Sequence, residues 1–299
     1  MITKFGKRFF TNYIAGNVTF LTKDIALGIG STTPDTSGND TRLDFEFYRL
    51  PATLGSMDIQ PNGSGGFNYY AVYKATIPQD ISGVVSEIGL YPGTRASINN
   101  YDSKFITSFE NNVNWFDSSN NNPQLKANST TEPFLSKIGE SMVQFDVLTS
   151  TSKEYQNSIV SLDLSGYSVN DSLTLAYKKK DNNVTNIRIK LYSSDTQYYY
   201  VDFTPTSGTG DKIQEVSMGT LFGNTSTVVP DATSIIKIGV EVTAGSGGPT
   251  TVYFDGLRVN DEDTFDPIFG LIARSLLTTP LQKPSGRPVD IEYRLKLEF

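Results

Sequence analysis

Short runs of alternating hydrophobic and polar residues recur along most of the chain. In the first hundred residues Leu43-Asp-Phe-Glu-Phe-Tyr alternates with a period of two, and further apolar segments lie at 25–30, 69–77 and 84–91. Such alternation places every second side chain on one face of a strand. The pattern predicts a small antiparallel β-sheet within residues 1–105.

From about Phe105 onward, strand-like segments follow one another at short, regular spacing. A loop rich in Asn, Ser and Pro at 118–123 precedes them. Eight strands spaced in this way are typical of a β-sandwich or jelly roll. The eight predicted strands are 142–147, 158–164, 172–177, 186–192, 198–203, 212–218, 234–242 and 251–259.

The end of the chain alternates without interruption from Val289 to Phe299. A strand this regular needs a partner in a sheet, and the jelly roll already has its eight strands. The most economical partner is the N-terminal sheet. We therefore predict an all-β protein in which a small split antiparallel platform domain, 1–105 and 266–299, carries an inserted jelly-roll domain at 106–265.

Composition supports the all-β class and narrows the function. The 18 Phe and 16 Tyr are residues typical of pleated, half-buried surfaces. The net charge of -7 argues against a nucleic-acid-binding surface. No apolar run reaches the roughly 18 residues that span a bilayer, so we expect no membrane insertion.

The chain contains neither cysteine nor histidine. Without cysteine, disulfides, thiolate metal sites and a cysteine nucleophile are excluded. Without histidine, the commonest general base and every Ser-His-Asp arrangement are missing. We predict that the protein is not an enzyme. A glycoside hydrolase that uses two carboxylates is the alternative, but nothing in the spacing selects a pair among the 32 acidic residues.

Three motifs between residues 109 and 259 occur in the same order as in a known family. Phe109-Glu110 is followed by Trp115, Ser161-Leu-Asp-Leu by Asp171-Ser-Leu-Thr-Leu, and Val252-Tyr-Phe-Asp-Gly-Leu-Arg-Val ends the series. Together they resemble the jelly-roll carbohydrate-binding modules attached to bacterial glycoside hydrolases.

This resemblance implies a structural calcium ion. In that family the acidic residue of the opening strand and the aspartate of the closing strand help to hold the ion, and they correspond here to Glu110 and Asp255. Calcium takes hard oxygen ligands, so the residue types fit. The alternative is two ordinary surface acids.

A second set of motifs flanks the jelly roll. Ser86-Glu-Ile-Gly-Leu-Tyr precedes it, and Leu271-Ile-Ala-Arg-Ser-Leu-Leu and Val289-Asp-Ile-Glu-Tyr-Arg-Leu follow it. They resemble tailed-phage virion proteins related to tail-collar and tail-fibre N-terminal domains. The resemblance implies a structural protein of the virion exterior, as a capsid decoration or a tail or fibre component, assembled in the bacterial cytoplasm. Its partners would be other capsid or tail proteins, and a homo-oligomer, with a trimer as one form, is expected.

Aromatic residues near the predicted strand 198–203 are candidates for sugar binding. Exposed aromatic faces pack on the C–H groups of sugar rings. Tyr192 and Tyr199 are the candidate glycan-binding residues, although alternation places Tyr199 opposite to Tyr198 and Tyr200, and core packing or a protein contact is the alternative. A host-surface glycan-binding adhesin of the tail is therefore the alternative function.

Overall fold

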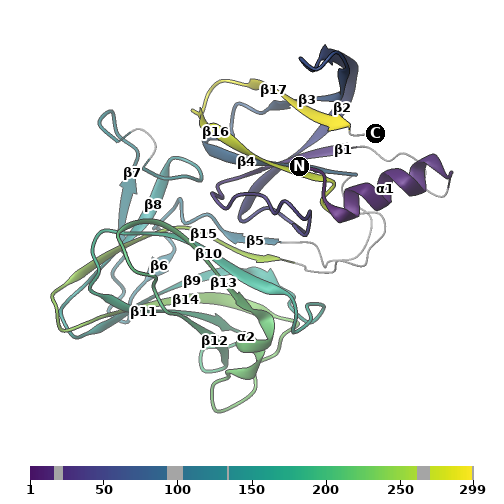
Figure 1. The fold of residues 1–299 in the computed structure, drawn as a ribbon. Coiled ribbons are helices and arrows are strands. Elements are labelled where there is room, and N and C mark those ends of the chain that lie inside the picture. Colours follow the sequence, from purple (N-terminus) through teal and green to yellow (C-terminus); the bar gives the residue numbers. More distant parts are fainter. Residues whose placement is uncertain (17–22, 93–103, 133–134, 261–269, 298–299) are drawn as a thin grey trace. The chain divides into compact units, whose positions relative to one another are not determined.

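The computed structural model describes residues 1–16, 23–92, 104–132, 135–260 and 270–297 (Figure 1). These ranges contain 17 strands and only two helices, of 11 and 6 residues, which confirms the all-β class. Every strand pair in them is antiparallel. No helix in the same ranges is long and apolar enough to cross a membrane.

The chain forms two compact units. Unit 1 comprises Met1–Ser97 with Asp263–Phe299, and unit 2 comprises Ile98–Glu262. The predicted boundary after residue 105 falls inside strand β5 (Lys104–Thr107), which pairs with β15 (Thr250–Asn260) of unit 2. Because a boundary cannot divide a paired strand, the first break lies earlier than the sequence pattern indicated.

Unit 1 is built on one six-stranded sheet. The last strand pairs with β3 from Val289 opposite Ile77 to Leu297 opposite Tyr69, which is the kind of pairing that its alternation predicts. The sheet order is β16 (Ala273–Lys283), β4 (Gly83–Tyr91), β1 (Lys23–Gly28), β2 (Glu46–Pro61), β3 (Phe67–Ile77) and β17 (Val289–Leu297).

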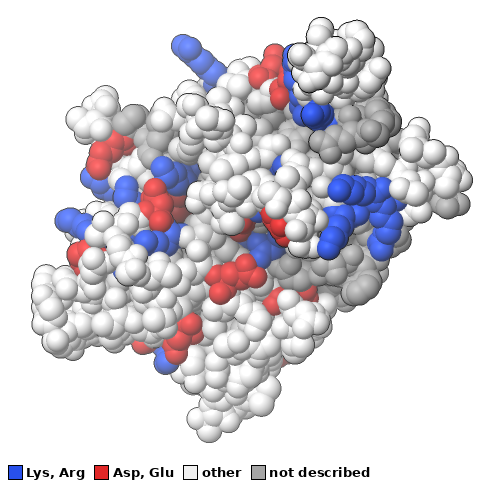
Figure 2. Space-filling model, in the orientation of Figure 1, with Lys and Arg blue, Asp and Glu red and all other residues white. Residues whose placement is uncertain are grey.

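Unit 1 also contains a helix that the sequence pattern did not indicate, α1 (Lys4–Ile14), whose Phe9 is buried in the core of the unit. Thr3 caps it, because its side chain accepts a hydrogen bond of 2.9 Å from the backbone N–H of Gly6. A Cβ at Gly6 would lie 2.2 Å from the Ile272 carbonyl oxygen, so glycine allows this close approach. The exposed side of α1 carries its basic residues, and Figure 2 shows Lys and Arg side chains gathered there.

A buried ion cluster joins the two sequence pieces of unit 1. The guanidinium of Arg274 on β16 lies 2.9 Å from the Glu87 carboxylate on β4 and 2.8 Å from that of Asp44. Glu87 also accepts hydrogen bonds from the backbone N–H groups of Gly30 and Phe45. Glu87 and Arg274 belong to the two motifs that flank the jelly roll in the sequence, and here they are partners.

Unit 2 is a sandwich of two sheets around one core. All eight predicted strands are present, as β8 to β15, with ends shifted by a few residues, whereas the short strands β5 to β7 and helix α2 were not predicted. One sheet has the order β13 (Gly210–Ser217), β10 (Ser172–Lys179), β15 (Thr250–Asn260), β8 (Ser141–Val147) and β7 (Gln124–Ala127), with β5 beside β15. The five-stranded sheet has the order β12 (Tyr198–Phe203), β11 (Val184–Tyr192), β14 (Ile235–Ala244), β9 (Ser152–Leu162) and β6 (Trp115–Phe116), and α2 is Met218–Gly223.

Aromatic rings fill the core at one end of the sandwich. Trp115 is fully buried and stacks on Phe109 with ring centroids 5.1 Å apart. Phe109 also packs against Phe254 of β15 at 5.5 Å. The first and last motifs that resemble carbohydrate-binding modules therefore meet in the core.

Candidate functional site

The five-stranded sheet of unit 2 turns one face to the core and the other away from it. Residues opposite one another in an antiparallel sheet share a face, so the pairing register determines which side chains meet. We call the side away from the core the outer face. Its side chains are Tyr198, Tyr200 and Asp202 of β12, Arg188, Lys190 and Tyr192 of β11, Lys237 and Glu241 of β14, Glu154, Gln156 and Ser158 of β9, and Phe116 of β6.

A charged network crosses the middle of the outer face. The ammonium of Lys190 donates to Glu154 at 2.6 Å and to Glu241 at 2.9 Å. The Tyr192 hydroxyl donates to the other oxygen of Glu154 at 2.6 Å, and the Gln156 amide donates to the Tyr192 hydroxyl at 3.1 Å. Five side chains from three strands are thus held together, mostly by charge-assisted hydrogen bonds.

Gly239 leaves the space that the side chains of this network occupy. It lies on β14, opposite Gln156 of β9 and Lys190 of β11. A Cβ at this position would lie 2.5 Å from a carboxylate oxygen of Glu154 and 2.9 Å from the ring of Tyr192. The absence of a side chain at Gly239 allows Tyr192 to reach across β14 to β9.

The tyrosine rings of the outer face are covered by cations. The Arg188 guanidinium lies 4.5 Å from the Tyr200 ring centroid, and the Lys237 ammonium lies 4.8 Å from that of Tyr192. Tyr198 packs 4.9 Å from Tyr192 and has the Lys190 ammonium 5.5 Å from its own ring. These rings are occupied by cation–π contacts and do not form an open stacking platform.

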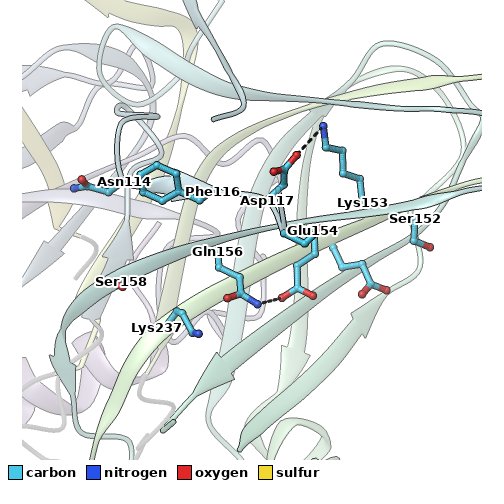
Figure 3. A pocket seen from close by; sticks show the side chains of 11 residues that line it. Asn114, Phe116, Asp117, Ser152, Lys153, Glu154, Gln156, Ser158 and Lys237 are labelled. Carbon is cyan, nitrogen blue, oxygen red and sulfur yellow. Dashed lines mark hydrogen bonds and ion pairs between the residues drawn. The ribbon is translucent and has the colours of Figure 1, made fainter. Parts of the chain in front are cut away.

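A pocket of about 970 Å³ opens beside this network, over β6, β9 and β14. Phe116, 39% exposed, is its aromatic residue, and Figure 3 shows it near Gln156 and Asp117. The remaining side chains that line it are polar: Asn114, Ser118, Ser152, Lys153, Glu154, Ser158, Lys237 and Glu241. The pocket therefore combines one exposed aromatic ring with side chains that can donate and accept hydrogen bonds.

Two carboxylates of the pocket, Glu154 and Asp117, have a lowered pKa. Burial raises the pKa of Glu154, but hydrogen bonds from Lys190, Tyr192 and Gln156 outweigh it, so the net pKa is lowered. The pKa of Asp117 is lowered as well, chiefly by the backbone N–H of Asn121. Around neutral pH, both groups therefore accept hydrogen bonds.

The two predicted glycan-binding tyrosines are not together. Tyr192 lies on the outer face but is only 3% exposed, because Lys237 and Tyr198 cover it. Tyr199 faces the core, where its hydroxyl donates to the Pro230 carbonyl at 2.8 Å. The prediction of Tyr199 as an exposed sugar platform was wrong, since the alternation of β12 turns it inward.

Sequence reasoning missed the residues that line the pocket. Phe116 could have been recognised because it follows the core residue Trp115, and neighbours in a strand point to opposite faces. Glu154 and Gln156 gave no such signal, because the predicted strand began only at residue 158.

Glu110 and Asp255 contact the same loop. Asp255 is 3% exposed and accepts hydrogen bonds from the Ser136 hydroxyl at 2.7 Å and the Lys137 N–H at 2.8 Å. Glu110 is exposed and accepts from the Glu140 N–H at 3.0 Å. The predicted metal-binding residues therefore both hold the segment 136–141.

The oxygen atoms around Ser136 provide a test of the calcium prediction. The Ser136 hydroxyl lies 2.7 Å from an Asp255 oxygen, 2.5 Å from the Ile138 carbonyl oxygen and 3.2 Å from the Ser141 carbonyl oxygen. One hydroxyl proton cannot serve three acceptors. A proton on Asp255 that donates to the Ser136 oxygen would relieve the conflict. A calcium ion would relieve it as well, because a carboxylate and backbone carbonyl oxygens are ligands of the type that calcium takes. In the described residues no three acidic side chains group together as a metal site, so backbone carbonyls would have to complete the ligand set.

Comparison with known proteins gives structural likenesses only. No family model and no curated protein matches the chain. A family 11 carbohydrate-binding module of a cellulosomal cellulase of Clostridium thermocellum is 15% identical, with 55% of this chain and 96% of that chain covered and a TM-score of 0.37. A family 30 carbohydrate-binding module from the same organism is 16% identical, with 54% of this chain and 99% of that chain covered and a TM-score of 0.39. The glycoside hydrolase domain of Endo-D from Streptococcus pneumoniae R6 is 12% identical, with 49% of this chain covered and a TM-score of 0.34. The match covers 22% of that chain, so this chain spans about a fifth of its length. At these TM-scores the likenesses carry no weight for the function.

Proposed function

We propose that unit 2 binds a neutral carbohydrate, without cleaving it, in the pocket beside Phe116. The observation that carries the proposal is an exposed aromatic ring in a concave site among amides, hydroxyls and ionised carboxylates. The ring can pack on the C–H face of a sugar while Gln156, Asp117 and Glu154 take its hydroxyls.

The charge balance of the pocket favours a neutral ligand. The two lysines that line it are already paired: Lys153 lies 3.5 Å from Asp117, and Lys237 lies 2.8 Å from Asp195. A sulfated or uronic acid glycan would have to displace one of these carboxylates, and its own charge would face Glu154. A neutral sugar meets neither cost.

The carboxylate chemistry supports binding rather than hydrolysis. A glycosidase needs one carboxylic acid with a raised pKa to protonate the leaving group. The pKa of Glu154 is lowered, and both Glu154 and Glu241 are held by the same Lys190 ammonium. This pair is suited to accepting hydrogen bonds.

A Phe116→Ala substitution tests the proposal. Against an array of neutral and acidic glycans, the wild-type protein should bind neutral ones, and the variant should bind roughly tenfold more weakly or worse, because an aromatic contact is lost. Phe105→Ala is the matched control, since Phe105 is 38% exposed but lies on β5, in the other sheet. Equal affinity of the wild-type and Phe116→Ala proteins, or release of reducing sugar by the wild type, would contradict the proposal.

The biological setting is proposed from the sequence resemblance. We propose that unit 1 attaches the chain to the exterior of a tailed-phage virion, with capsid or tail proteins as partners, and that unit 2 acts there as a host-surface glycan-binding module. What supports this is the pair of motifs that flank unit 2. Mass spectrometry and antibody labelling of purified particles test it, and absence of the chain from those particles would contradict it.

We also propose calcium at the loop 136–141, held by Asp255 with the carbonyl oxygens of Ile138 and Ser141. The ion would tie β15 to the loop before β8. Isothermal titration with calcium chloride tests this proposal, and Asp255→Asn should abolish the binding. The absence of binding heat in the titration of the wild-type protein would contradict the proposal.

A further inference from the structure

The sheet of unit 1 extends into an arm. Strand β2 pairs with β1 only as far as Ala52, but its pairing with β3 continues to Pro61. Strand β3 in turn pairs with β17 on its other side. We call the strand segments 53–61, 67–74 and 292–297 the arm.

The two faces of the arm have opposite chemistry. On one face, cross-strand pairs join charged side chains: Lys74 lies 3.1 Å from Glu292, and Arg294 lies 3.3 Å from Asp58. On the other face, opposite residues are apolar, as with Ile59 opposite Tyr69 and Pro61 opposite Phe67. The large side chains of this apolar face, with their exposed fractions, are Leu54 (51%), Met57 (56%), Ile59 (56%), Phe67 (58%) and Tyr69 (38%).

The apolar face continues the core of unit 1. The next residues along the same face of β3 are Ala71 and Tyr73, which are buried in that core with Tyr293 and Leu295 of β17. Farther along the arm the same alternation persists, but the side chains are exposed. Figure 2 shows the tip of the β2–β3 hairpin, at the top of the view, without charged side chains. Contiguous exposed apolar surface of this kind marks an interaction site.

We propose that the apolar face of the arm packs against the same face of a second copy of this chain. A surface that meets itself about a two-fold axis must not carry net charge, because like charges would face each other. The described arm meets that condition, since its charged pairs lie on the opposite face. The inference is independent of carbohydrate binding.

The area suffices for such a contact. Five large side chains that each leave roughly 100 Å² exposed offer about 500 Å² per copy. Two copies then bury about 1,000 Å², which is near the lower bound of a specific interface. A second copy therefore covers the exposed face with surface of the same kind and size.

The test is the mass of the full chain in solution. Light scattering after size exclusion, or sedimentation equilibrium, from 1 to about 100 μM should give two copies for the wild type. The double variant Met57→Glu with Ile59→Glu should give one copy and weaken association at least a hundredfold, because two like charges then face two others. Phe67→Ser is a second variant with the same expected direction.

Thr53→Glu with Ser56→Glu is the matched control. It adds the same two charges to the same strand but on the polar face, where Thr53 lies opposite Lys74. The control should remain dimeric, and all variants should keep the wild-type circular dichroism spectrum, since the substituted side chains are already exposed. A wild type that is monomeric at every concentration, a mass of three copies, or a dimer that survives both Met57→Glu with Ile59→Glu and Phe67→Ser would overturn the proposal.

Discussion

Asp255→Asn should remove a pH dependence of stability in unit 2. Asp255 is 3% exposed, and burial raises the pKa of its carboxyl group to about 7, in spite of hydrogen bonds from Ser136, Lys137 and Ile138. A proton on this carboxyl would donate to the Ser136 oxygen. The Ser136 hydroxyl would then donate to the Ile138 carbonyl oxygen, 2.5 Å away.

The raised pKa of Asp255 sets the direction and the magnitude of the change in the free energy of unfolding with pH. An unfolded aspartate titrates near 3.8, whereas the folded group titrates at about 7. Between these values the folded protein holds a proton that the unfolded chain has released. The contribution of Asp255 to the free energy of unfolding is therefore fully present below pH 3.8, decreases as the pH rises, and is lost once the pH has passed through 7. The difference between 3.8 and about 7 corresponds to at most about 4 kcal/mol.

Asparagine imitates the protonated carboxyl. Its amide nitrogen can donate to Ser136 while its oxygen accepts from the N–H groups of Lys137 and Ile138. Asp255→Asn should therefore match the wild type at pH 4 and become more stable than it toward pH 8, by up to about 4 kcal/mol without metal.

Urea unfolding in EDTA at several pH values between 4 and 8 measures this difference. Asp195→Asn is the control, because that carboxylate is exposed and its pKa is lowered by Lys237. A difference in stability between the wild type and Asp255→Asn that stays constant with pH would show that Asp255 does not titrate in this range. Added calcium at pH 8 should restore the stability of the wild type and leave Asp255→Asn unchanged, if the ion takes the place of the proton.

Two further substitutions test the packing described above by thermal or urea unfolding. Gly239→Ala should destabilise unit 2 by about 1–3 kcal/mol, because the added Cβ meets Glu154 and Tyr192, and a loss below about 0.5 kcal/mol would mean that the network moves freely. Arg274→Met should destabilise unit 1 by about 3 kcal/mol, because Glu87 stays buried without its cation; an unchanged unfolding midpoint would show that the backbone N–H groups suffice.

Most of the strands and the faces of their side chains could be predicted from the alternation of hydrophobic and polar residues. Alternation is a local property, so residues such as Tyr198 and Tyr200 could be assigned to the face opposite Tyr199 without a structure. The same alternation indicated that the final strand needs a sheet, and β17 does pair with β3. Helix α1 was not predicted, because the Phe-rich segment that forms it shows no period-two alternation. Its close packing depends on Gly6 lying beside Ile272, which is far away in the sequence.

Which of the outward-facing residues are open to a ligand could not be predicted from the sequence. The side chain of Tyr192 points away from the core. It is nevertheless buried, because Lys237 covers its ring and Glu154 accepts a hydrogen bond from its hydroxyl. Phe116 stays exposed beside Gln156 because β6 is a two-residue strand at the edge of the sheet. The physical reason is that a side chain's direction follows from its own strand, whereas its exposure depends on cross-strand neighbours that the register brings together.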